Sequence, residues 1–94
     1  MDLGIEGRTA LVTGGTGGIG RDICRSLVAE GARCVVVARD RRRIDGLVDE
    51  LRAGGGRAEG LAGDVTRGEE IDRIVTHAAE SFGGLDILVN AAAR

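Results

Sequence analysis

Residues 13–20 read Thr13-Gly14-Gly15-Thr16-Gly17-Gly18-Ile19-Gly20 and separate two segments of different apolar periodicity. Before them, Thr9 to Val12 is a short apolar run that predicts a buried strand. After them, Ile19, Ile23 and Leu27 recur four residues apart, which predicts a helix. Glycines between a strand and a helix allow a tight bend and a close approach of the backbone to a ligand. Because the N–H groups at a helix start attract negative charge, the segment predicts a pyrophosphate-binding turn.

The same change of periodicity repeats along the chain. Cys34 to Ala38 is rich in β-branched residues, as in a strand buried on both faces, and Ile44 to Leu51 has helical spacing. Arg57 to Gly63 and Leu85 to Val89 predict two further strands, with a helix over Ile71 to Phe82 between them. Glycines follow each predicted helix, and the first of them is a candidate left-handed cap. The order β-α-β-α-β-α-β predicts an α/β, Rossmann-like fold with a parallel sheet.

The predicted sheet is incomplete. In a doubly wound fold the first two helices cover one face and the third begins to cover the other. A single helix leaves part of that second face bare, and the fourth strand leaves an unpaired edge. We therefore expect residues 1–94 to be the N-terminal, dinucleotide-binding part of one Rossmann domain, without a second domain. A second copy of the chain or a longer relative could cover the bare face.

Composition limits the classes of partner. The formal net charge is −2, and Arg41 to Arg43, the longest basic run, is interpreted as a solvated helix start rather than a nucleic-acid contact. No apolar run reaches the roughly 18 residues of a membrane span, and Met1 to Arg8 does not resemble a signal peptide. Cys24 and Cys34 lie outside any metal-ligand spacing and are expected to be reduced and half-buried. These features predict a cytoplasmic protein without a metal, nucleic-acid or membrane partner.

The glycines fit two related patterns. Gly15, Gly17 and Gly20 satisfy GxGxxG, whereas Gly14, Gly18 and Gly20 satisfy GxxxGxG, and the spacing alone leaves both open. A Walker phosphate loop is excluded because no Lys follows the glycines. The turn therefore predicts binding of a dinucleotide.

The end of the second predicted strand reads Ala38-Arg39-Asp40. A carboxylate at this place binds the ribose 2′-hydroxyl of NAD, whereas an Arg accommodates the 2′-phosphate of NADP. Arg39 offers a planar, charged fork to a phosphate, so the sequence favours NADP over NAD. Asp40 leaves two alternatives open, because it could cap the next helix or compete for the ribose.

At this point the sequence resembles the short-chain dehydrogenase/reductase family, and within it the ketoreductases. The resemblance runs from Gly7 to Ala93. Its segments are Leu11-Val12-Thr13-Gly14, Gly18-Ile19-Gly20, Glu30-Gly31-Ala32, Gly63-Asp64-Val65-Thr66 and Gly84-Leu85-Asp86-Ile87-Leu88-Val89-Asn90. It favours the GxxxGxG pattern. It implies an oxidoreductase that interconverts carbonyl and alcohol groups, on a 3-ketoacyl or polyketide-like substrate.

The resemblance also implies the role of each site residue. Gly14 to Gly20 correspond to the pyrophosphate turn, and Arg39 to the Arg of NADP-preferring members. Asp64 and Val65 correspond to the pair that reads the adenine, and Asn90 to the first Asn of an Asn-Asn-Ala-Gly motif. The residues expected to bind the cofactor are Gly14, Gly15, Thr16, Gly17, Gly18, Ile19, Gly20, Arg39, Asp64, Val65 and Asn90.

The chain departs from the family pattern at the Asn-Asn-Ala-Gly motif and in its catalytic residues. Ala91 replaces the second Asn, and Ala93 puts a methyl group where the family has Gly. The family's catalytic Ser and Tyr-x-x-x-Lys pair would follow the fourth strand, and the sequence contains no Tyr and no Lys. His77 has no Ser, Cys or carboxylate constellation around it and is interpreted as an exposed helical residue.

These departures set the functional prediction. We expect the NADP(H)-binding part of a reductase whose catalytic half is missing, so that the chain is inactive alone. One alternative is a non-catalytic nucleotide-binding or regulatory module that associates with a full-length relative. Another is a decayed, truncated gene product.

Overall fold

The computed structural model of the protein describes residues 4–14, 16–64 and 66–91. Its elements are β1 (Thr9–Thr13), α1 (Gly18–Ala29), β2 (Arg33–Ala38), α2 (Arg41–Ala53), β3 (Arg57–Ala62), α3 (Gly68–Phe82) and β4 (Ile87–Asn90). The order predicted from the periodicity is confirmed.

The predicted boundaries of the fourth strand were wrong by one or two residues. β4 begins at Ile87 rather than Leu85 and ends at Asn90 rather than Val89. Leu85 lies in the loop before the strand and packs against the core. Its apolar side chain is explained by this burial rather than by membership of the strand. The strand pairing begins after Asp86, whose backbone N–H donates to the carbonyl of Thr9 at 2.9 Å.

The sheet has the order β3-β2-β1-β4, and all its pairs are parallel. β2 and β3 follow in order on one side of β1, and β4 pairs with the other side of β1. Thr13, the last residue of β1, pairs with Val37 of β2 and with Asn90 of β4. The carboxyl ends of the central strands therefore meet at one edge, where the strand order reverses, which is the usual binding position in an open α/β sheet.

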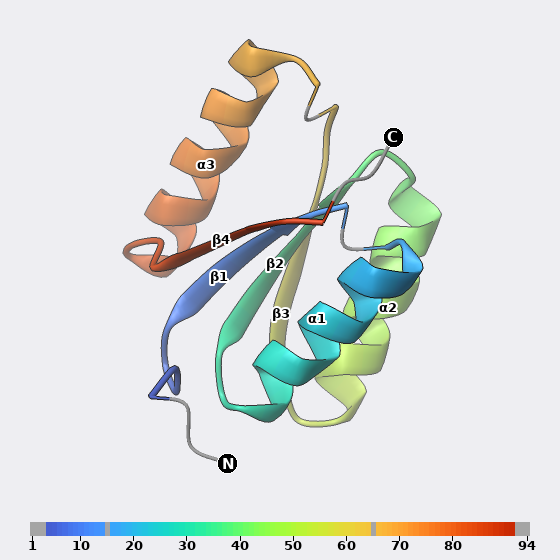
Figure 1. Ribbon diagram of the computed structural model, residues 1–94, viewed down its shortest axis with the longest axis vertical. Coiled ribbons are helices and arrows are strands. Elements are labelled where there is room, and N and C mark those ends of the chain that lie inside the picture. The colour runs from blue at the N-terminus through green and yellow to red at the C-terminus, as the bar shows by residue number, and fades with distance from the viewer. Residues whose placement is uncertain (1–3, 15, 65, 92–94) are drawn as a thin grey trace.

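Helices cover the two faces of the sheet unequally. Figure 1 shows α1 and α2 side by side on one face and α3 on the other. Alternate residues of β1 point to opposite faces, so that Val12 lies in the core beneath α1 and α2 while Leu11 packs with Ile74 beneath α3. Beside α3, Leu88 of β4 remains 62% exposed. The incomplete covering of the second face is confirmed.

The burial predicted for the two cysteines was wrong. Cys24 of α1 and Cys34 of β2 are fully buried and unoxidised, not half-buried. A hydrogen bond with Cys24 and burial raise the pKa of the Cys34 thiol, which favours its neutral form. Sequence spacing could not show this, because the burial of both residues depends on how closely α1 packs on β2.

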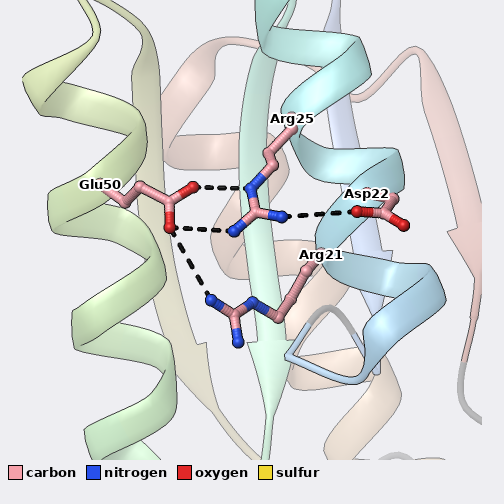
Figure 2. A network of polar contacts seen from close by, with 4 residues as sticks. All are labelled: Arg21, Asp22, Arg25 and Glu50. Atoms are coloured by element: carbon pink, nitrogen blue, oxygen red, sulfur yellow. Dashed lines mark hydrogen bonds and ion pairs between the residues drawn. The ribbon is translucent and has the colours of Figure 1, made fainter.

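A polar network joins α1 to α2 (Figure 2). The guanidinium of Arg25 binds both carboxylate oxygens of Glu50, with Nε 2.6 Å from Oε2 and Nη2 3.0 Å from Oε1. Arg21 approaches the same carboxylate at 3.8 Å, and Asp22 lies 3.4 Å from Arg25. The hydrogen bonds from Arg25 lower the pKa of Glu50 and keep it ionised. The network thus connects the two helices that follow the glycine turn and β2.

The predicted left-handed cap of the first helix is confirmed at Gly31, which has φ +88°. Its N–H donates to the carbonyl of Val28 and the N–H of Ala32 to that of Leu27, both at 3.0 Å, as in a Schellman motif. Within the residues that the structure describes, no helix combines the length and apolar composition needed to cross a lipid bilayer.

Candidate dinucleotide-binding site

The glycine turn is built on a backbone conformation that favours glycine at its first position. Gly14 follows β1 with φ +70°, where a side chain is strained. Its N–H donates to the carbonyl of Val37 at 2.8 Å, and its own carbonyl accepts from the N–H of Gly17 at 3.2 Å. The turn is therefore held against the end of β2. Gly15, another predicted site residue, lies outside the described residues.

The N-terminus of α1 differs from those of the other two helices. Its N-cap is Gly17, and among the described residues no side chain caps it and its first turn has no acidic residue. By contrast, α2 is capped by Asp40, and α3 has Glu69 and Glu70 in its first turn. The partial positive charge at the start of α1 therefore remains available to an anion.

A cleft of about 560 Å³ lies at the carboxyl ends of the strands. Its lining consists of Gly14, Thr16, Gly17, Gly18, Ile19, Gly20, Ala38, Arg39, Arg43, Gly63, Thr66, Asn90 and Ala91. Eight of the residues predicted from the sequence are in this set: Gly14, Thr16, Gly17, Gly18, Ile19, Gly20, Arg39 and Asn90. The other five lining residues, Ala38, Arg43, Gly63, Thr66 and Ala91, were not among the residues expected to bind the cofactor. For Arg43 the available signal was its spacing of four residues from Arg39.

Asp64, also predicted, is not among the described residues that line the cleft, although Gly63 and Thr66 on either side of it are. Its carboxylate accepts hydrogen bonds from the backbone N–H of Thr66 at 3.0 Å and from the Thr66 hydroxyl at 2.6 Å. These bonds, with smaller contributions from the charges of Arg39 and Arg67, lower the pKa of Asp64. The carboxylate is therefore ionised at neutral pH and can accept a hydrogen bond from an amine. Val65 lies outside the described residues.

Arg39 extends from the end of β2, and its side chain is 72% exposed. Its Nε lies 3.8 Å from Oδ1 of Asp64. An exposed pair at this distance is weak, so the guanidinium can turn to another anion at little cost.

The two alternatives for Asp40 are now distinguished. Oδ1 of Asp40 accepts from the N–H groups of Arg42 and Arg43, at 3.0 and 3.4 Å, and Oδ2 lies 3.7 Å from Nε of Arg43. Among the described residues, those that line the cleft do not include Asp40. Its carboxylate caps α2.

The end of β4 joins the cleft through Asn90. The hydroxyl of Thr13 donates to Oδ1 of Asn90 at 3.0 Å, and the N–H of Ala91 donates to the carbonyl of Thr13 at 2.9 Å. Ala91, the substituted position of the family motif, lines the cleft with its neighbour, whereas Ala93 lies outside the described residues. His77 is exposed on α3, as predicted, and is not among the described residues that line the cleft.

Comparison with known proteins agrees with this geometry. Residues 8–94 match the family described as short chain dehydrogenase. The chain belongs to this family. An A-factor type gamma-butyrolactone 1′-reductase from Streptomyces virginiae is 48% identical over 83 residues, which are 88% of this chain and 32% of that relative. The resemblance stated from the sequence is thereby confirmed.

Solved structures show the same short-chain dehydrogenase fold. L-sorbose reductase from Gluconobacter frateurii, complexed with NADPH and L-sorbose, has a TM-score of 0.94 and 41% identity and matches 100% of this chain and 36% of its own. A variant of actinorhodin polyketide ketoreductase with NADPH has a TM-score of 0.88 and 40% identity, with the same coverages. This chain thus spans about a third of the length of the relatives it matches. Their names point to different substrates, so the shared part of the fold does not by itself define one.

Proposed function

We propose that this chain is the NADP(H)-binding part of a short-chain dehydrogenase that interconverts carbonyl and alcohol groups. The observation that carries the proposal is that the uncapped start of α1 and the Arg39 guanidinium line one cleft. A dinucleotide with a 2′-phosphate presents two phosphate centres to such a cleft. On this proposal, residues 1–94 act as one dinucleotide-binding unit.

The glycine turn fits a pyrophosphate. A Cβ added at Gly18 would meet no described protein atom within 4 Å, so the backbone at the start of α1 borders open space in the cleft. N–H groups there can donate to phosphate oxygens without obstruction by side chains. We assign the pyrophosphate to Gly14 through Gly20, with Gly15 included from its place in the motif.

The preference for NADP rests on Arg39 and Asp40 together. Arg39 lines the cleft, whereas the carboxylate that follows it is engaged at the start of α2. A ribose 2′-hydroxyl would therefore lack a carboxylate partner at this position, and a 2′-phosphate would gain a cation. The two structural relatives solved with NADPH support this assignment.

The ionised carboxylate of Asp64 is assigned to the adenine amine, beside Val65, and Asn90 is assigned to the nicotinamide end of the cleft. When bound, NADPH would supply the hydride. Among the described residues that line the cleft there is no Tyr, Lys, His or Cys. The task of these residues is therefore to bind and orient the cofactor. For the enzyme as a whole we propose the 3-ketoacyl or polyketide-like substrate that the sequence resemblance implies, which fits one of the two structural relatives, the polyketide ketoreductase.

Calorimetric titration of the purified chain with NADPH and with NADH tests the proposal. We expect saturable binding that is tighter for NADPH, and Arg39→Ala should weaken NADPH binding about tenfold while leaving NADH binding unchanged. Arg57→Ala removes the same charge from the first residue of β3, at the opposite end of the sheet, and should change neither affinity. The absence of saturable binding by either dinucleotide would contradict the proposal, and equal affinities would contradict the preference for NADP.

A further inference from the structure

We propose that Arg43 is a second specificity-determining residue, which holds the 2′-phosphate together with Arg39. This inference rests on the proposed NADP(H) function. The sequence points only to Arg39, because Arg43 lies inside a predicted helix and a basic run that is otherwise solvated. The structure places both guanidinium-bearing residues on the wall of one cleft.

The position of Arg43 follows from the way α2 begins. Arg39 ends the turn after β2, and Asp40 is the N-cap, so Arg43 falls in the first turn of α2, four residues after Arg39. Nε of Arg43 lies 3.7 Å from Oδ2 of Asp40, whose other oxygen accepts from the helix backbone. An exposed pair at this distance is weak, so the Arg43 guanidinium can turn from Asp40 toward the cleft at little cost. The Arg43 side chain remains 70% exposed, so it can still reach an incoming phosphate.

A second hollow, of about 600 Å³, adjoins the cleft on the side of α2. Its lining is Thr16, Gly17, Gly18, Arg21, Arg43, Gly46 and Leu47. Thr16, Gly17, Gly18 and Arg43 line both spaces. Arg43 therefore lies where the cleft continues between the glycine turn and α2. A Cβ added at Gly46 would meet no described atom within 4 Å. This glycine, unfavourable inside a helix, leaves the space beside Arg43 open.

Two other arginines near the cleft are engaged elsewhere. Arg21 lines the hollow but points to Glu50, with Nη2 3.8 Å from Oε1 (Figure 2). Arg41 pairs with Asp45 at 3.1 Å and donates to the carbonyl of Gly60 at 3.3 Å. Neither Arg21 nor Arg41 is among the described residues that line the cleft, whereas Arg39 and Arg43 both are.

Arg42 provides a matched control. It lies between Arg41 and Arg43 in the same helical turn and is exposed, but it is not among the described residues that line the cleft or the hollow. Arg42→Ala and Arg43→Ala therefore make the same change in net charge and helix propensity. Any difference between the two variants reports the position of the side chain.

Titration with adenosine 2′,5′-bisphosphate and with 5′-AMP isolates the 2′-phosphate, because the two ligands differ by that group alone. We expect Arg43→Ala to weaken binding of the bisphosphate about tenfold and to leave AMP binding unchanged, as for loss of a charge-assisted contact. Arg42→Ala should change neither affinity by more than about twofold, since Arg42 is exposed and is not among the described residues that line the cleft or the hollow. Circular dichroism on all variants checks that α2 is retained.

The outcomes separate the inference from the function on which it rests. Equal bisphosphate affinities of Arg43→Ala and Arg42→Ala would overturn the role of Arg43. If Arg39→Ala still lost its preference for NADPH in that case, the NADP(H) proposal would stand. If the unaltered chain bound neither NADPH nor the bisphosphate, both would fall.

Discussion

Arg39 and Asp64 face each other across the carboxyl ends of two adjacent strands, with Nε of the first 3.8 Å from Oδ1 of the second. The register explains the meeting, because Ala38 pairs with Ala62 at the ends of β2 and β3. The Arg39 guanidinium is suited to bind a phosphate, and the Asp64 carboxylate is suited to bind an amine. Substitutions of the two residues should therefore affect NADPH and NADH binding differently. Arg39 should affect the choice between NADPH and NADH, whereas Asp64 should affect both cofactors equally.

Asp64→Ala should therefore weaken NADPH and NADH by the same factor. The adenine is common to both ligands, and loss of a hydrogen bond to a charged acceptor corresponds to roughly tenfold in affinity. Calorimetric titration with each dinucleotide measures the two factors separately. Asp72→Ala, at an exposed position of α3, removes the same charge and should leave both affinities unchanged. A loss confined to NADPH would show that Asp64 acts through Arg39 instead.

Acid should weaken the fold in part through Asp86. Its Oδ2 accepts from the N–H of Thr9 at 2.9 Å and its Oδ1 lies 3.4 Å from Arg8, and these contacts lower its pKa below the ordinary value of 3.8. A depressed pKa in the folded state stabilises the protein at pH values above 3.8, and the effect is lost as the pH falls through the lower, folded value. Asp86→Asn should therefore be less stable than the unaltered chain at pH 7, by an amount that shrinks towards pH 3.

Urea unfolding at a series of pH values measures this difference. Asp72→Asn makes the same chemical change at the exposed position in α3 and should show no comparable pH-dependent difference. A difference for Asp86→Asn that stayed constant from pH 7 to pH 3 would indicate lost packing or strand geometry rather than lost charge.

The sequence predicted the fold well because its signals are local. The change from a short apolar run to helical periodicity needs only neighbouring residues, and glycine at 14 and 31 reflects backbone conformations that few other residues adopt comfortably. The glycine turn and Arg39 were found for the same reason, since each occupies a fixed place relative to a strand end. Their meeting in one cleft follows from the parallel order of the sheet.

Other features depended on contacts between elements, which periodicity does not contain. From the sequence, Asp40 could cap the next helix or compete for the ribose. In the structure its carboxylate accepts from backbone N–H groups at the start of α2. Arg43 belonged to a run interpreted as solvated, and only the position of α2 beside the glycine turn places it in the cleft. Cys24 was buried more deeply than predicted because α1 packs directly on the sheet.

Two glycines should respond in opposite ways to alanine. At Gly60 of β3, an added Cβ would collide with Ile44 of α2, so Gly60→Ala should destabilise the protein by roughly 1–3 kcal/mol. At Gly46 the same methyl group meets open space, and Gly46→Ala should stabilise by about 0.5–1 kcal/mol through helix propensity. Urea unfolding gives both values. Equal effects of the two substitutions would show that α2 does not pack on β3 as closely as described.

The contact between Arg25 and Glu50 should make stability depend on salt. Because both oxygens of Glu50 are bound by Arg25 across two helices, Arg25→Ala should lower the thermal midpoint at low ionic strength. The groups are exposed, so the difference from the unaltered chain should diminish in about 1 M salt, where the screening length is only a few ångströms. Arg73→Ala is the control, since the ion pair of Arg73 with Glu70, at 3.5 Å, lies within the single helix α3. A loss for Arg25→Ala that did not change with salt would assign the effect to packing of its aliphatic stem rather than to the ion pair.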